Sequence, residues 1–149
     1  MDGYFSTNGH PMFKISVYGH SAQWSVPVEA MLDTGFTGFL SLPLTFCLRA
    51  GLILISTADY TLADGSISST LLCLGTITLE DGRKVTGAIS VSFKGRDALL
   101  GMEFLNKLGE KLELDPTLKT VRIVSIKSTP IVRVLFHPFW EEMQVEARS

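Results

Sequence analysis

The chain has 149 residues, of which 46% are hydrophobic and 19% are charged, and its formal net charge is -2. This length and composition predict one folded domain with an apolar core and exclude a disordered chain. The small negative charge argues against nucleic acid as a partner, because domains that bind it are usually basic. No signal peptide and no apolar stretch of roughly 18 residues is recognisable, so we expect a cytoplasmic protein without membrane partners.

The local sequence is dominated by patterns that are typical of β-strands. Residues 12–20 and 24–33 alternate or run apolar and contain Val, Ile and Tyr, which predicts two strands. The Asp-Gly pairs at 64–65 and 81–82 lie between further strand-like segments. Asp-Gly is a strong signal for a two-residue hairpin turn in which both residues have positive φ. We therefore expect two β-hairpins with their tips at these pairs.

Two short segments carry helix signals. Residues 42–51 have Pro43 near the start and a glycine just past the end, and residues 101–109 also close on a glycine. Proline at the start and glycine after the end is the usual asymmetry of an α-helix. Residues 111–126 then predict a strand, an Asp-Pro turn and a second strand.

The cysteines, histidines and isolated aromatic residues predict packing and not chemistry. Cys47 and Cys73 lie in apolar surroundings without another cysteine or histidine at ligand spacing, so we expect buried thiols, with a disulfide as the alternative. Trp24 and Phe93 are expected in the core. The histidines are scattered and predict neither a metal site nor a cofactor; they are His10, His20 and His137.

The most informative segment is EAMLDTGFTGFL, residues 29–40. It places Asp33 and Thr34 inside a stretch that otherwise reads as buried, and a carboxylate there costs free energy unless it is paired or hydrogen-bonded. Gly35 permits a tight turn with unusual backbone angles. Asp33 could be a structural turn carboxylate that caps the following loop. The alternative is a carboxylate kept for chemistry.

Four segments in this order resemble the retroviral-type, or retropepsin-like, aspartic proteases, and most closely their single-domain bacterial and cyanobacterial members. The segments are MLDTGFTGFLSLP, a short helix that ends in RAGL, the hairpin YTLADGSIS, and ALLGMEFLNKLG followed by the strand pair LELDPTLKTVRIV. The resemblance covers residues 12–126, with 1–11 as an N-terminal extension and 127–149 as an appendage of unknown role. It implies an all-β, closed-barrel acid protease fold with a flap hairpin and two short helices.

The resemblance implies peptide-bond hydrolysis without a metal or cofactor. Two carboxylates about 3 Å apart share a proton, and they activate a water and protonate the scissile carbonyl. The chain has only one Asp-Thr-Gly, so the second Asp33 would come from a second copy in a homodimer that cuts a peptide or protein substrate. The same fold could instead serve as a non-catalytic dimerisation or peptide-binding module. A third reading is a protease that cuts only itself or one partner.

The resemblance also implies roles for the neighbours of Asp33. Thr34 and Gly35 would support the active site, and Phe36 stands where relatives carry Ser or Ala. A serine hydroxyl can stabilise an ionised carboxylate and a phenyl ring cannot, so we expect activity that extends toward neutral pH. The flap tip over the substrate would consist of Ala63, Asp64 and Gly65. The scaffold of the catalytic loop would consist of Leu99, Leu100 and Gly101.

Overall fold

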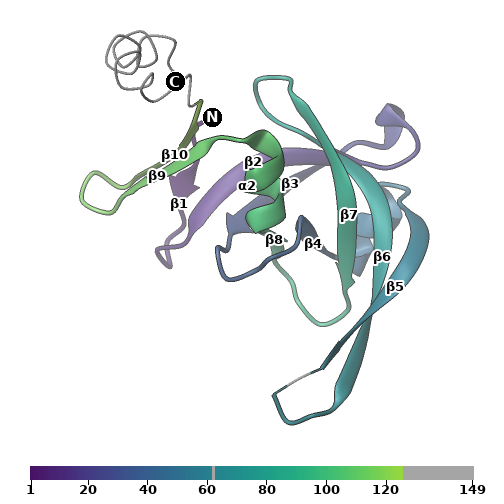
Figure 1. Ribbon diagram of the computed structural model, residues 1–149. Helices are drawn as coiled ribbons and strands as arrows, with labels where there is room; N and C mark the ends of the chain where they lie inside the picture. The colour runs from purple at the N-terminus through teal and green to yellow at the C-terminus, as the bar shows by residue number, and fades with distance from the viewer. Residues whose placement is uncertain (62, 126–149) are drawn as a thin grey trace, which may run out of the picture.

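The computed structural model describes residues 1–61 and 63–125, and just over half of these residues lie in β-strands (Figure 1). The strands are β1 (Tyr4–Phe5), β2 (Pro11–Tyr18), β3 (Val26–Leu32), β4 (Leu40–Pro43), β5 (Ile53–Thr61), β6 (Ile67–Thr78), β7 (Lys84–Ser92), β8 (Ala98–Leu100), β9 (Lys111–Asp115) and β10 (Thr120–Val124). The helical segments are the 3-10 helix η1 (Ala22–Trp24) and the α-helices α1 (Leu44–Arg49) and α2 (Met102–Leu108). His137 and the predicted appendage 127–149 lie outside the described residues.

One sheet closes on itself to form a barrel. Its strand order is β1-β2-β3-β8-β4-β7-β6-β5, and an additional pairing of β2 with β6 completes the ring. Two of its pairings, β3 with β8 and β4 with β7, are parallel. Strands β9 and β10 form a separate pair, which lies at the opposite end of the molecule from the tip of the β5–β6 hairpin (Figure 1). The predicted all-β, closed-barrel fold with few short helices is confirmed.

Side chains that alternate along the strands fill the barrel. The inward-facing residues of β2 and β3 are Phe13, Ile15, Val17, Val26, Val28, Ala30 and Leu32, and all of them are buried. Both cysteines are buried and free, as predicted. Burial raises the pKa of the Cys47 thiol to about 12 and also raises the pKa of Cys73, so both remain protonated and unreactive.

The hairpins lie where they were predicted, but the prediction of two-residue turns is wrong. The last paired residues are Thr61 with Ile67 and Thr78 with Lys84, so both loops are longer than two residues. The glycines at 65 and 82 have positive φ, whereas the aspartates before them do not. Each aspartate carboxylate instead accepts the backbone N–H two residues further on. The side chain thus replaces the backbone hydrogen bond of the expected turn.

Two aromatic residues predicted in the core are exposed. Trp24 is 58% exposed and Phe93 is 62% exposed. The strand predicted to begin at residue 24 begins at Val26, because Trp24 belongs to η1 outside the barrel. A Cβ built on Gly51 would lie 2.5 Å from the Trp24 ring, so the missing side chain at Gly51 makes room for this aromatic ring on the surface.

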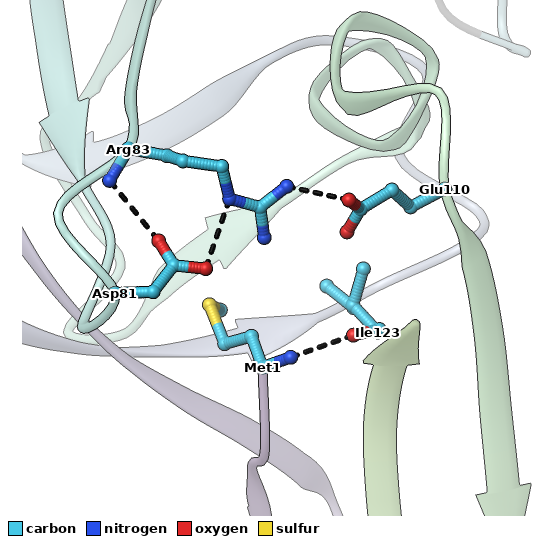
Figure 2. A network of polar contacts seen from close by, with 5 residues as sticks. All are labelled: Met1, Asp81, Arg83, Glu110 and Ile123. Carbon is cyan, nitrogen blue, oxygen red and sulfur yellow. Dashed lines mark hydrogen bonds and ion pairs between the residues drawn. The ribbon is translucent and has the colours of Figure 1, made fainter. Parts of the chain in front are cut away.

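The first residues of the chain pair with the last described strand. The Met1 amine donates to the Ile123 carbonyl at 2.7 Å, and the Ile123 N–H donates to the Met1 carbonyl at 2.8 Å (Figure 2). The Gly3 N–H donates to Val121 O at 2.8 Å. Residues 1–3, the beginning of the predicted N-terminal extension 1–11, therefore pair antiparallel with β10. No helix within residues 1–61 and 63–125 has the length and apolar character needed to cross a bilayer.

Arg83 connects the β6–β7 turn to the residue that precedes β9. Its guanidinium lies between two carboxylates, at 2.9 Å from Asp81 Oδ2 and 2.5 Å from Glu110 Oε2 (Figure 2). The hydrogen bond to Glu110 contributes most to raising the pKa of Arg83, and the Arg83 N–H is the main reason that the pKa of Asp81 is lowered. The Glu110 side chain is only 12% exposed, and its Oε1 is buried without a partner among the described residues.

Replacing Arg83 with Met is expected to lower the free energy of unfolding by about 2 kcal/mol, because Glu110 would keep a mostly buried carboxylate without a cation. Lys107→Met is the matched control, since Lys107 pairs with Glu103 at 3.8 Å between two exposed side chains. That change is expected to cost about 0.5 kcal/mol or less. Urea denaturation of both variants measures the difference, and equal effects would contradict a structural role for the Arg83–Glu110 pair.

Candidate active site

Asp33 lies at the point where β3 ends and the loop to β4 begins. Its N–H donates to the Leu100 carbonyl of β8 at 2.9 Å, which continues the parallel pairing of Leu32 with Leu100. Its carboxylate oxygen Oδ1 accepts the Gly35 N–H at 2.9 Å. The Asp33 side chain is half-buried, so the barrel holds the residue at both its backbone and its carboxylate and leaves part of it accessible.

The beginning of α2 holds the rest of the loop. Three consecutive backbone N–H groups donate to carbonyls of residues 36–39. The bonds are Gly101 N to Phe39 O at 3.1 Å, Met102 N to Phe36 O at 2.8 Å, and Glu103 N to Gly38 O at 3.1 Å. The first N–H groups of a helix have no partner within the helix. The loop therefore satisfies these donors, and α2 in turn fixes the loop that follows Asp33.

The Phe36 ring fills space that two glycines leave open. A Cβ built on Gly38 would lie 2.6 Å from Phe36 Cζ, and one built on Gly101 would lie 2.6 Å from Phe36 Cδ2. A Cβ at Gly101 would also overlap the carbonyl oxygen of Gly38. The ring thus packs at the contact between the loop and α2. Sequence reasoning missed Gly38, because nothing in its local sequence distinguishes it from an ordinary loop glycine.

Strand β8 lies between the strand that enters the loop and the strand that leaves it. Leu100 pairs with Leu32 of β3 and Leu40 of β4, and its side chain is fully buried. Leu99 pairs with Met31 of β3 and with Ser41 of β4. The structure therefore brings Leu99 and Leu100, together with Gly101, against the segment that carries Asp33. Thr34 is exposed at the loop surface.

The residues predicted for the flap tip lie apart from this cluster. Ala63, Asp64 and Gly65 are at the end of the long β5–β6 hairpin, which projects away from the barrel (Figure 1). Asp64 Oδ1 accepts the Ser66 hydroxyl at 2.6 Å and the Ser66 N–H at 2.9 Å. The hydroxyl is the main reason that the pKa of Asp64 is lowered. The tip is thus ordered by its own side chains.

A pocket of about 420 Å³ adjoins the loop. Residues 35–39 form one wall, Leu72 of β6 with Ala88 and Ser90 of β7 form another, and Glu103 of α2 lies at its side. Sequence reasoning did not find this pocket. Its residues come from four separate parts of the chain, so no local spacing signals it.

Comparisons with known proteins identify the fold. No family model matches the chain, and no curated protein matches it in sequence. Among the 16 chains of solved structures that match is EIAV protease complexed with the inhibitor HBY-793. It is 20% identical, and the match has a TM-score of 0.52 and covers 74% of this chain and 98% of that chain. The chain therefore has the all-β fold of the retropepsin-like aspartic proteases.

Proposed function

We propose that this protein is an aspartic endopeptidase that acts as a homodimer, with water activated between the two Asp33 carboxylates. The observation that carries the proposal is the position of Asp33 in this fold. Asp33 stands at the end of a barrel strand, its carboxylate accepts the Gly35 N–H, and its backbone N–H donates to the Leu100 carbonyl. Strand β8 thus holds the backbone of Asp33 and α2 holds the loop that follows it, which is more support than a carboxylate that only caps a turn would need.

The chemistry requires a second copy of the chain. One carboxylate must act as a base toward water while the other donates a proton to the scissile carbonyl. The sequence supplies one Asp-Thr-Gly, so twofold symmetry would supply the second. Thr34 is exposed in the single chain, as a residue that braces one loop against its symmetry mate must be.

The substrate proposed is an extended peptide with large apolar side chains on either side of the cleaved bond. It would lie between the Asp33 loop and the β5–β6 hairpin, with Ala63, Asp64 and Gly65 as the flap tip. An extended peptide can pair with strand backbone and place alternate side chains in pockets. The retropepsin-like fold, which the chain shares with EIAV protease, supports this assignment.

Cleavage of a fluorescence-quenched peptide library by the wild type and by Asp33→Asn tests the proposal. Turnover that disappears in the variant supports it. Turnover that persists in the variant would contradict the role of Asp33. A folded, dimeric wild type that cleaves nothing would instead favour a non-catalytic peptide-binding module, the second function that this fold allows.

We expect the wild-type activity to extend toward neutral pH. Position 36 holds a phenyl ring, which packs against Gly38 and Gly101. Because phenylalanine has no hydroxyl, this position cannot donate a hydrogen bond to an ionised carboxylate. A pH–rate profile from about pH 3 to 8 measures this, with Phe36→Ser as the comparison, which should move the profile toward acid. An optimum below about pH 3.5, near the ordinary pKa of an aspartic acid, would contradict the expectation.

A further inference from the structure

The pocket beside the Asp33 loop has a chemical character that the general preference for apolar substrates does not explain. Most of its lining is small or apolar, with loop residues 35–39 facing Leu72 and Ala88. One ionisable side chain, Glu103, completes the lining. Two other pockets of similar volume, about 500 and 470 Å³, contain no residue of the Asp33 loop. This pocket is therefore the one among them that a peptide bound at Asp33 would reach.

The strands that form the pocket place it next to the proposed substrate. This inference rests on the proposed function. One wall begins at Gly35, two residues after Asp33, and the opposite wall contains Leu72 of β6. Strand β6 is also the second strand of the hairpin that would cover the peptide. The pocket therefore opens between the two parts of the chain that would hold the substrate, where a side chain flanking the cleaved bond can enter.

Glu103 offers a carboxylate that a substrate can use. Its side chain is 44% exposed, and its ion pair with Lys107 is 3.8 Å long, which is beyond hydrogen-bonding distance. An exposed pair of this length between two neighbouring turns of a helix is weak. The backbone of Glu103 is fixed by its N–H bond to Gly38 O, so the carboxylate projects from a defined point beside the loop.

We propose that Glu103 is a specificity determinant that selects peptides with a lysine or arginine side chain in this pocket. The apolar stem of such a side chain would lie along Leu72 and the loop, and its charged end would meet the Glu103 carboxylate. The selected residue would flank the apolar pair at the cleaved bond. Lys107 opposes the selection, because it is the cation that already faces Glu103.

The test uses short peptides with a central apolar pair and either arginine or its neutral isostere citrulline at one flanking position. For the wild type, kcat/KM is expected to be about fivefold higher with arginine at the position that enters the pocket. In Glu103→Gln this ratio should fall to about one, and in Lys107→Met the ratio should rise. Glu80→Gln, which removes an exposed carboxylate in the β6–β7 turn, should keep the wild-type ratio.

Binding separates this inference from the proposed function. Fluorescence anisotropy with Asp33→Asn should show tighter binding of the arginine peptide than of the citrulline peptide, and the double variant Asp33→Asn, Glu103→Gln should bind both equally. Such selective binding without any turnover by the wild type would overturn the protease proposal and keep Glu103 as a specificity residue. Three results would overturn the inference. They are equal kcat/KM for the arginine and citrulline peptides at every flanking position, an arginine-to-citrulline ratio that is unchanged in Glu103→Gln, and no binding of either peptide.

Discussion

Asp33→Asn is expected to lower kcat/KM for peptide cleavage at least about 10³-fold, because it removes both the base and the acid of the proposed reaction. The folded structure should survive. The asparagine side-chain oxygen can still accept the Gly35 N–H that Asp33 Oδ1 accepts at 2.9 Å. The backbone bond to Leu100 is unaffected by the change. Circular dichroism and thermal unfolding should therefore match the wild type while activity is lost.

The same variant tests whether two copies of Asp33 act together. A mixed dimer has one carboxylate and one amide and should be inactive. If the copies exchange freely, a roughly ninefold excess of Asp33→Asn would leave about a tenth of the wild-type chains in wild-type dimers, with activity reduced in proportion. Activity unchanged by the added variant, when sedimentation shows that the copies exchange, would contradict a shared site. Residual cleavage by the pure variant at the wild-type rate would contradict the role of Asp33 itself.

Gly101→Ala is expected to have the largest effect on stability, lowering the free energy of unfolding by about 3 kcal/mol. The reason is steric and does not involve the backbone angles. Gly101 has φ −109° and ψ −174°, which is extended backbone that any residue adopts. The added Cβ would overlap the Gly38 carbonyl and lie 2.6 Å from the carbonyl oxygen of Phe36. Two backbone oxygens cannot move aside as the end of a flexible side chain can.

Gly109→Ala, at the other end of α2, is the matched control for this prediction. Gly109 has φ 64° and ψ 34°, and a Cβ there would meet nothing within 4 Å. Alanine in this left-handed conformation is expected to cost about 1 kcal/mol. Urea denaturation at one fixed protein concentration compares the two variants. A Gly101→Ala variant as stable as Gly109→Ala would show that the loop and α2 are not locked together as the contacts indicate.

The contact between the loop and α2 also has a consequence for activity. Because Gly101 and the first two residues of α2 donate three N–H groups to residues 36–39, a shift at Gly101 moves the segment that follows Asp33. A displacement of about 1 Å in a positioned catalytic group can cost about 10² in rate. Gly101→Ala should therefore lose activity even at temperatures where it remains folded, whereas Gly109→Ala should keep it.

Local patterns in the sequence predicted the elements of this fold. Alternating apolar residues predicted β2 and β3, and proline and glycine at the ends of 42–51 predicted α1. Asp33 was found because a carboxylate is unusual in an apolar segment, and a few neighbouring residues are enough to reveal it. These signals are short-range, since strand alternation, helix ends and turn residues each depend on the conformation of neighbouring residues. The two-residue turns failed for a local reason as well, because the aspartate side chains form the turn bonds themselves.

The sequence by itself thus determined the all-β class, the hairpins and the position of the candidate carboxylate. The tertiary structure alone decided what surrounds that carboxylate. Gly38 and Gly101 are 63 positions apart, and their close approach exists only because β8 lies between β3 and β4. Burial is decided at the same level. Trp24 is exposed although it is an apolar residue at the start of a segment that reads as a strand. Contacts between distant segments depend on the path of the whole chain, and no local pattern encodes that path.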